Sequence, residues 1–262
     1  MKITHLALAT VAALAAAPAL AAPNWIGTAD YGLETVGPFN TYDLSSAGVL
    51  LIEPLLDPLN PNAARGYYQS SVTAHLLDGL QIQSPGLAAN NYELTIVADF
   101  NSSRTSVNAF GETFGVNSGN FALYLDTTPD RDFATDSGFT DGLKIMEGSI
   151  TSGGGSLGYV GGGIMQFGGA MLDLTVTGYD TSVFSPATIA GGNSTFSLRL
   201  GAPFDATFLS TINNVQGVGT TGNLLYVADG DLILAAVPEP KSLAMMLAGL
   251  GMIGAMSLRR RS

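Results

Sequence analysis

Residues 91–100, with the sequence NYELTIVADF, decide the fold class of this chain because their side chains alternate between apolar and polar. In an extended segment Leu94, Ile96, Ala98 and Phe100 lie on one face, and mostly polar residues lie on the other. An apolar period of two is typical of a β-strand that buries one face in a core. We therefore predict a half-buried strand here.

Similar alternation recurs on both sides of this segment. Strands are also predicted at Val72–Leu77, Gly79–Gln83, Asn120–Asp126, Leu143–Ile150, Met171–Gly178, Ser194–Leu200 and Asp231–Ala236. No stretch of about 12 residues in this part of the chain shows the period of 3.6 that is typical of a helix. Clusters of Gly, Asn, Ser and Pro separate the strands. The sequence predicts an all-β protein with a single antiparallel β-sandwich or jelly-roll-like domain.

Two segments interrupt the alternation. Gly153–Gly169 has nine glycines in 17 residues, but it has no following lysine or helix start for a phosphate loop. We predict a flexible loop or a glycine-loosened strand. Val49–Pro61 contains three prolines, which break helices and central strands, so we predict an irregular apolar segment at the domain edge.

Residues 1–21 have the features of a cleavable secretory signal peptide. Lys2 precedes an apolar run from Leu6 to Leu20, and small residues follow up to a cleavage site after Ala21. The alternative is an uncleaved anchor, which the short apolar run makes less favourable. We therefore predict that the chain is exported.

The other end of the chain, residues 237–262, reads VPEPKSLAMMLAGLGMIGAMSLRRRS. Val237 precedes Pro238, Glu239 and Pro240, and the two prolines fix the backbone on either side of the glutamate. We predict a stiff, extended and exposed segment at this point.

Residues 242–258 follow without a charge, and as a helix they would span about 26 Å, the short end of what a bilayer needs. The cluster of Arg259, Arg260 and Arg261 then stops the span, and such clusters stay on the cytoplasmic side. A transmembrane helix is predicted, with everything before Pro238 across the membrane. The alternative is a core helix with a basic end.

This tail of Pro238, Glu239 and Pro240, apolar span and basic cluster resembles the PEP-CTERM sorting signal of exported proteins in Gram-negative bacteria. The resemblance implies two processing partners, the Sec export machinery and exosortase, a membrane-embedded cysteine transpeptidase that cuts near the Pro-Glu-Pro. It also implies a localisation: transient anchoring in the inner membrane, then release or attachment at the cell surface or in the extracellular matrix.

Residues 22–236, between the two targeting segments, are predicted to form one exported domain. They contain 20 of the 21 acidic residues and five of the 10 basic ones, which gives a net charge near −15. Such a charge excludes nucleic acid as a partner and favours divalent cations. The chain has no cysteine, so disulfides, thiolate metal sites and a cysteine nucleophile are excluded.

The densest acidic stretch contains Asp126, Asp130, Asp132, Asp136 and Asp141. Calcium takes six to eight oxygen ligands, and alternate aspartates in a loop are able to supply some of them. The spacing departs from an EF-hand, because no glycine stands six positions and no glutamate 12 positions into a loop that starts at Asp130. Calcium is therefore the candidate cofactor, and a solvated acidic hairpin loop is the alternative.

The same segment carries a second resemblance, to the central block of flocculation-associated PEP-CTERM proteins. The matching residues are Gly119, Asn120, Phe121, Gly138, Phe139, Asp141, Gly142, Ile145 and Gly148. That family belongs to bacteria that form flocs and biofilms in an exopolysaccharide matrix. The resemblance implies association with this matrix and transfers no catalytic residue.

Catalytic motifs are absent from the exported sequence. Its single histidine, His75, lies in an apolar strand pattern, and no Gly-x-Ser-x-Gly elbow accompanies it. One histidine without cysteine also excludes the common zinc sites. Paired carboxylates for glycoside hydrolysis remain open, because two acids can come from distant strands. We predict that the protein is not an enzyme.

Two classes of function follow from these features. The first is a structural or adhesive surface protein that works in floc or biofilm formation with exopolysaccharide. The alternative is a secreted glycan-binding or glycan-cleaving protein delivered by the same signal. The first is favoured because no catalytic constellation stands out.

Overall fold

The computed structural model describes residues 23–160, 165–189, 194–201 and 206–237. Four predicted features lie outside the described residues: the signal peptide, the Pro-Glu-Pro segment, the apolar span and the arginine cluster. Among the residues described, no helix has the length and apolarity needed to cross a membrane.

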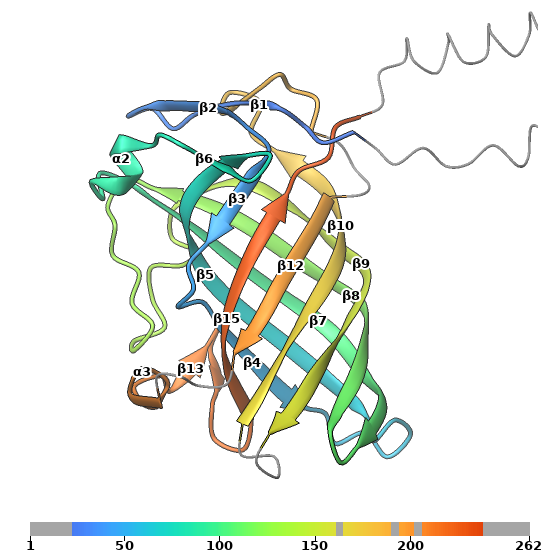
Figure 1. Cartoon of the computed structure of the whole chain (residues 1–262). Coiled ribbons are helices and arrows are strands. Elements are labelled where there is room, and N and C mark those ends of the chain that lie inside the picture. The colour runs from blue at the N-terminus through green and yellow to red at the C-terminus, as the bar shows by residue number, and fades with distance from the viewer. Residues whose placement is uncertain (1–22, 161–164, 190–193, 202–205, 238–262) are drawn as a thin grey trace, which may run out of the picture.

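The long strands form one closed antiparallel barrel (Figure 1). In chain order they are β3 (Thr41–Leu44), β4 (Val49–Pro54), β5 (Ala63–Leu77), β7 (Glu93–Asn108), β8 (Gly111–Asp126), β9 (Leu143–Val160), β10 (Met165–Tyr179), β12 (Ser194–Gly201) and β15 (Leu224–Ile233). β3 and β4 share one position in the ring, because both pair with β5 and with β15. The ring closes where β15 pairs with β12, which makes eight strand positions.

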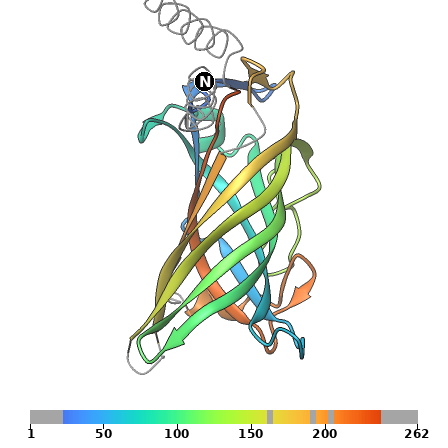
Figure 2. The ribbon, with the colours of Figure 1, turned by 90° about the vertical axis from the view of Figure 1, so that its right-hand side faces the viewer.

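The predicted all-β antiparallel class is confirmed, but the predicted β-sandwich or jelly roll is wrong. A sandwich and a barrel both bury one face of each strand, so they have the same alternating pattern. Closure depends on pairings between distant segments, such as Leu232 of β15 with Tyr42 on one side and Phe196 on the other. Figure 2 shows the strands running obliquely around the barrel, as closure of eight strands requires.

The two irregular segments of the sequence are largely strands. The glycine-rich stretch lies in β9 and β10, which confirms the glycine-loosened strand for its described residues. The prediction of an irregular segment at Val49–Pro61 is wrong for Val49–Pro54, which form β4. Pro54 ends this strand, and the other two prolines lie in the loop that follows.

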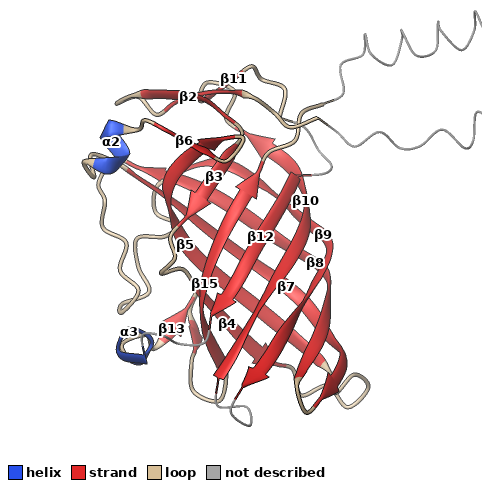
Figure 3. Cartoon of the chain, viewed as in Figure 1, coloured by secondary structure: helices blue, strands red, loops and turns tan. Residues whose placement is uncertain are grey.

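A three-stranded sheet covers one end of the barrel, which we call the lid end (Figure 3). It consists of β1 (Gly27–Asp30), β2 (Thr35–Phe39) and β11 (Phe184–Ser185). Near it lie β6 (Leu80–Ile82) and helix α2 (Pro85–Ala88). Helix α3 (Ala206–Ser210) and the hairpin of β13 (Asn214–Val215) and β14 (Val218–Gly219) lie against the outer wall.

Trp25 fastens the lid to the barrel. Its fully buried ring packs edge-on against Phe39 at 5.5 Å and Phe184 at 5.9 Å between centroids, and its indole N–H donates to the Pro186 carbonyl at 2.9 Å. The Trp25 backbone N–H also donates to the carbonyl of Leu234, just after β15. The first and last described residues therefore meet at the lid end.

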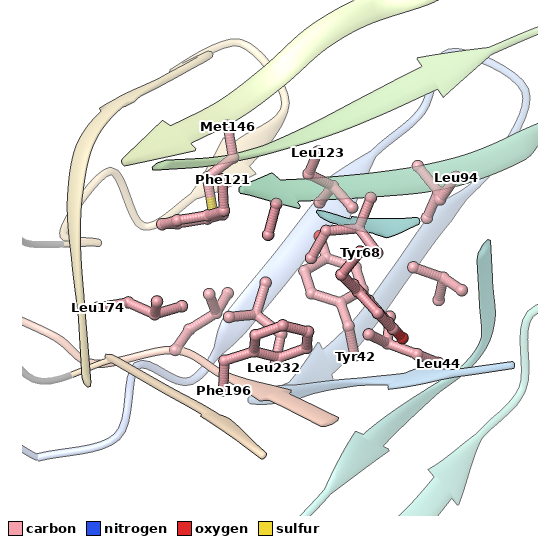
Figure 4. Packing of buried hydrophobic residues seen from close by; sticks show 14 of the residues in the cluster. Tyr42, Leu44, Tyr68, Leu94, Phe121, Leu123, Met146, Leu174, Phe196 and Leu232 are labelled. Carbon is pink, nitrogen blue, oxygen red and sulfur yellow. The ribbon is translucent and has the colours of Figure 1, made fainter. Parts of the chain in front are cut away.

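The main core lies inside the barrel. Side chains from facing strands meet there, among them Phe121, Leu174, Tyr68 and Phe196 (Figure 4). The rings of Tyr68 and Phe196 make an edge contact at 5.3 Å between centroids. Burial of each large apolar side chain contributes about 1.5–3 kcal/mol, so this packing is the main stabilising feature of the fold.

A second, smaller core lies outside the barrel wall. Val49 and Leu51 of β4 face outward but are fully buried, because Leu209, Ile212 and Val215 cover them. The segment from α3 to β14 therefore acts as an outer cover for β4. This burial on both faces explains why the sequence of β4 is continuously apolar from its start and does not alternate.

Candidate functional site

The predicted acidic segment starts at the end of β8 and forms a loop before β9, and Glu93 holds this loop in place. One Glu93 carboxylate oxygen accepts the backbone N–H groups of Asp130 and Arg131, at 3.0 Å and 3.1 Å. The other oxygen pairs with the Arg131 guanidinium. Glu93 is 2% exposed, so its charge is compensated by this ion pair and by the two N–H groups.

Glu93, Asp126 and Asp130 form an acidic cluster in which one carboxylate oxygen from each lies within 4.8 Å of the others. Desolvation and the nearby charges of Asp141, Asp126 and Glu93 raise the pKa of Asp130. A bound cation would relieve this repulsion. Carboxylate oxygens are hard ligands that suit calcium better than soft transition metals.

Asp132 and Asp136, two further predicted ligands, are not members of the acidic cluster. Asp132 accepts the Ala134 N–H at 2.8 Å, within its own turn. Asp136 accepts the N–H groups of Gln216 and Gly217 at 3.0 Å and 2.6 Å, which joins the loop to the outer cover.

Asp141 and Asp126 line a hollow of about 580 Å³ at the lid end. Asp30 of β1 and Asp180, which follows β10, line the same hollow. In Asp30, Asp126 and Asp180, one oxygen accepts the N–H two residues ahead, at distances from 2.7 to 2.9 Å. Bonds from the Ser182 hydroxyl and backbone lower the pKa of Asp180. The hollow thus gathers carboxylates from three separate parts of the chain.

Sequence reasoning missed Glu93, Asp30 and Asp180. Glu93 is a polar position in an alternating strand, and the backbone N–H groups that bond to it follow 37 and 38 residues later in the chain. Asp30 and Asp180 both end a strand or directly follow one and have a small residue two places on. That pattern, shared with Asp126, was the available signal. Calcium binding at this site stays a prediction.

His75 is the nearest approach to catalytic machinery in the described residues. Its Nδ1 lies 2.9 Å from the Ser84 hydroxyl, and its Nε2 lies 2.7 Å from the Tyr31 hydroxyl. The ring is fully buried, and burial lowers the pKa of His75 to about 4. In a Ser-His-Asp triad the second ring nitrogen bonds to a carboxylate. Here that nitrogen contacts Tyr31, and the nearby Glu34 carboxylate bonds to α2 and Tyr92. This arrangement supports a structural role, in which His75 ties the lid to β5.

The last described residues, Ala236 and Val237, are bonded to the lid end of the folded domain. Ala236 forms a bridge with Ile189, and its N–H donates to the Pro23 carbonyl at 2.8 Å. The Val237 N–H donates to the Thr188 carbonyl at 3.0 Å. Val237, which the sequence places in the tail, is therefore still hydrogen-bonded to the folded domain.

A family model for the PEP-CTERM protein-sorting motif matches residues 236–261, directly at this junction. The chain is an exosortase substrate. Proteins with this motif are exported and sorted to the cell surface by exosortase, which confirms the resemblance drawn from Pro238, Glu239 and Pro240. The chain matches none of the curated proteins and none of the solved structures.

Proposed function

We propose that this exosortase substrate is a non-catalytic surface protein that contributes an acidic β-barrel to the matrix of flocs or biofilms and associates there with exopolysaccharide. One observation carries the proposal: the sorting motif begins at Ala236, which an isolated bridge to Ile189 still ties to the folded domain. What exosortase delivers is therefore the barrel itself. The resemblance of the Gly119–Gly148 block to flocculation-associated proteins supports the same setting.

The non-catalytic part of the proposal rests on the state of the reactive groups. His75 is buried, has a pKa of about 4 and bonds to Tyr31 and Ser84. A general base works best when its pKa lies near the operating pH, so this histidine is poorly suited to accept a proton at neutral pH.

Association with polysaccharide is supported by a polar groove of about 420 Å³ on the outer wall, across β7, β8 and β9. Its lining includes Asn120, Ser149, Thr177 and Gln216, whose side chains are suited to hydrogen-bond sugar hydroxyls. This groove also makes glycan binding the second candidate function. Glycan cleavage is less favoured, because the lining carboxylates are ion-paired: Asp99 to Arg65 at 2.6 Å and Glu147 to Lys144 at 2.8 Å.

The acidic surface should make association between copies of the domain depend on divalent cations. On the outer wall Asp43 lies opposite Asp231 on the paired strands β3 and β15. Partial burial, followed by the charges of Asp231 and Asp229, raises the pKa of Asp43. Copies of such a domain repel each other at low salt, and divalent cations that screen or bridge the carboxylates favour association.

The test is a deletion strain complemented with four forms of the gene. The wild-type gene should restore flocculation, and a form that ends at Ala236 should not. Asn120→Ala in the groove should weaken binding of the strain's own polysaccharide about fivefold, the loss of one hydrogen bond. Asn101→Ala is the matched control, an exposed asparagine on the outer wall that is not part of the groove.

Polysaccharide analysis separates the two classes of function. We expect secretion of polysaccharide of normal length in the deletion strain, with weaker flocs. Normal flocculation together with accumulation of unprocessed polysaccharide would instead establish the enzyme and refute the structural role.

A further inference from the structure

The barrel contains a cavity of about 90 Å³ at the end opposite the lid, which we call the open end. Most of its wall is apolar, and Leu50, Phe100, Leu157 and Leu198 contribute to it from four different strands. Apolar cavities of comparable size stay dry and accept apolar guests. This cavity is separate from the acidic hollow and from the outer groove, and the proposed function does not use it.

The cavity exists because small residues face inward at the open end. Ala64 of β5 and Ala170 of β10 line it. Nearer the lid, the same inward faces carry Tyr68 and Leu172, which are fully buried and fill the barrel. The space is therefore built into the sequences of these two strands.

The mouth of the cavity carries a compact polar group. Arg104 Nε donates to Glu112 Oε2 at 2.8 Å, and both residues line the cavity. The Tyr159 hydroxyl also bonds to Glu112, and burial together with this bond raises the pKa of Tyr159. The backbone N–H of Arg104 is held by the Asn62 carbonyl at 3.0 Å. The mouth thus offers a fixed donor and a fixed acceptor with no net charge.

Apolar side chains are exposed on the loops at this end. Leu56 and Leu59, in the loop between β4 and β5, are 99% and 95% exposed. Phe110, in the turn between β7 and β8, is 83% exposed. Both loops lie at the open end of the barrel (Figure 1). An apolar molecule that approaches the mouth meets apolar surface before it enters.

We propose that the open end binds a small uncharged amphiphile, whose short alkyl chain enters the cavity while its hydroxyl or amide bonds to the Arg104–Glu112 pair. The size follows from the volume, since the cavity is smaller than an engineered cavity of about 150 Å³ that accepts benzene and far smaller than drug-sized sites of about 300–1,000 Å³. The lack of charge follows from the neutral ion pair and from the acidic surface, which repels anions.

The experiment titrates residues 23–237 with linear 1-alkanols of increasing chain length. This segment contains the closed barrel with both of its cores, so it is able to fold as a unit. Methyl NMR should show saturable shifts at cavity residues such as Leu198 and Leu200. Affinity should rise about fourfold for each added methylene, and then level off once the cavity is full.

Two matched variants locate the site. Ala170→Phe fills the cavity and should lower the affinity at least tenfold. Met171→Phe, the next residue along β10, points outward and is 61% exposed in the native chain, so it should leave the affinity unchanged. Leu56→Ser combined with Leu59→Ser removes the apolar loop surface and should slow entry without removing saturable binding.

Two outcomes would overturn the proposal. One is the absence of saturable shifts for every alkanol, and the other is a folded Ala170→Phe protein that binds as the wild type does. Loss of all binding in the Leu56→Ser, Leu59→Ser variant would indicate adsorption to the loops. If Ala170→Phe fails to fold, the wild-type series still decides, because adsorption keeps rising with chain length whereas a cavity reaches a limit.

Discussion

The two ends of the barrel are made by the same strands and are packed in opposite ways. At the lid end, where a second sheet covers the barrel, Trp25, Phe39, Tyr42 and His75 are fully buried. At the open end, Ala64 and other small residues leave a cavity, and the loop leucines are exposed. The lid end is thus the closely packed end of the barrel. The open end retains a cavity and exposed apolar loops.

The difference is also one of polar chemistry. At the lid end, Tyr31, Tyr42, His75 and Ser84 form a chain of hydrogen bonds that satisfies buried groups. At the open end, the Arg104–Glu112 pair is partly exposed, with 45% of the arginine side chain accessible. A buried, satisfied network fixes one conformation, whereas an exposed pair is available to a ligand.

The largest expected effect is on the lid. Trp25→Ala removes a fully buried ring and its hydrogen bond, and should lower the free energy of unfolding by about 3–5 kcal/mol. Phe110→Ala at the open end removes a ring that is 83% exposed and should change stability by less than about 0.5 kcal/mol. Urea denaturation of both variants measures the contrast, and equal losses would refute it.

The next largest effect is a pH dependence of the free energy of unfolding, caused by His75 at the lid end. Burial lowers the pKa of His75 from 6.5 to about 4, so the unfolded chain binds a proton that the folded chain does not. This contribution to stability is fully present above pH 6.5 and is lost as the pH falls toward 4, by about 3 kcal/mol in total. His75→Gln should flatten the stability profile between pH 6.5 and 4.5, and an unchanged slope would contradict the assignment.

Calcium should act on the same end of the barrel. If the acidic cluster binds calcium, free calcium at 100 times the dissociation constant would add about 2.7 kcal/mol to the free energy of unfolding. Asp130→Asn should abolish this gain. Asp132→Asn, in the same loop but outside the cluster, should keep it. A melting temperature that is indifferent to millimolar calcium and to chelator would reject the site.

The smallest effect is expected at the exposed loops. Leu56→Ser and Leu59→Ser should each change the free energy of unfolding by less than about 0.5 kcal/mol, because the native side chains are 99% and 95% exposed. Thermal unfolding measures this directly. A loss above 1 kcal/mol would show that the loop contributes to the core.

The same comparison explains what the sequence could predict. Most of the predicted strands, such as Val72–Leu77 and Asn120–Asp126, form the lid half of a longer strand. Large apolar residues face inward there, so the period of two is visible. In the open half, inward positions hold Ala64, Ser102 or Arg104, and the alternation disappears although the strands continue.

Other features depend on contacts between distant segments, which no local pattern carries. The pairing of β15 with β12 closes the sheet into a barrel, whereas a sandwich was predicted. The acidic loop was found from sequence, but its partner Glu93 was not, because burial of that carboxylate depends on the loop folding back over β7. Arg104 had a usable signal: it continues the inward phase of Ile96 and Phe100, where a charge is unexpected.

The junction at Thr188, Ile189 and Val237 would set the orientation of a copy that is attached through its C-terminus. Both ends of the folded domain leave from the lid, so a copy held by its C-terminus stands with the lid toward its attachment point. Neighbouring copies held in the same way all stand in one direction. A layer of copies attached in this way would have a single polarity, and its surroundings would meet the loops of the open end first.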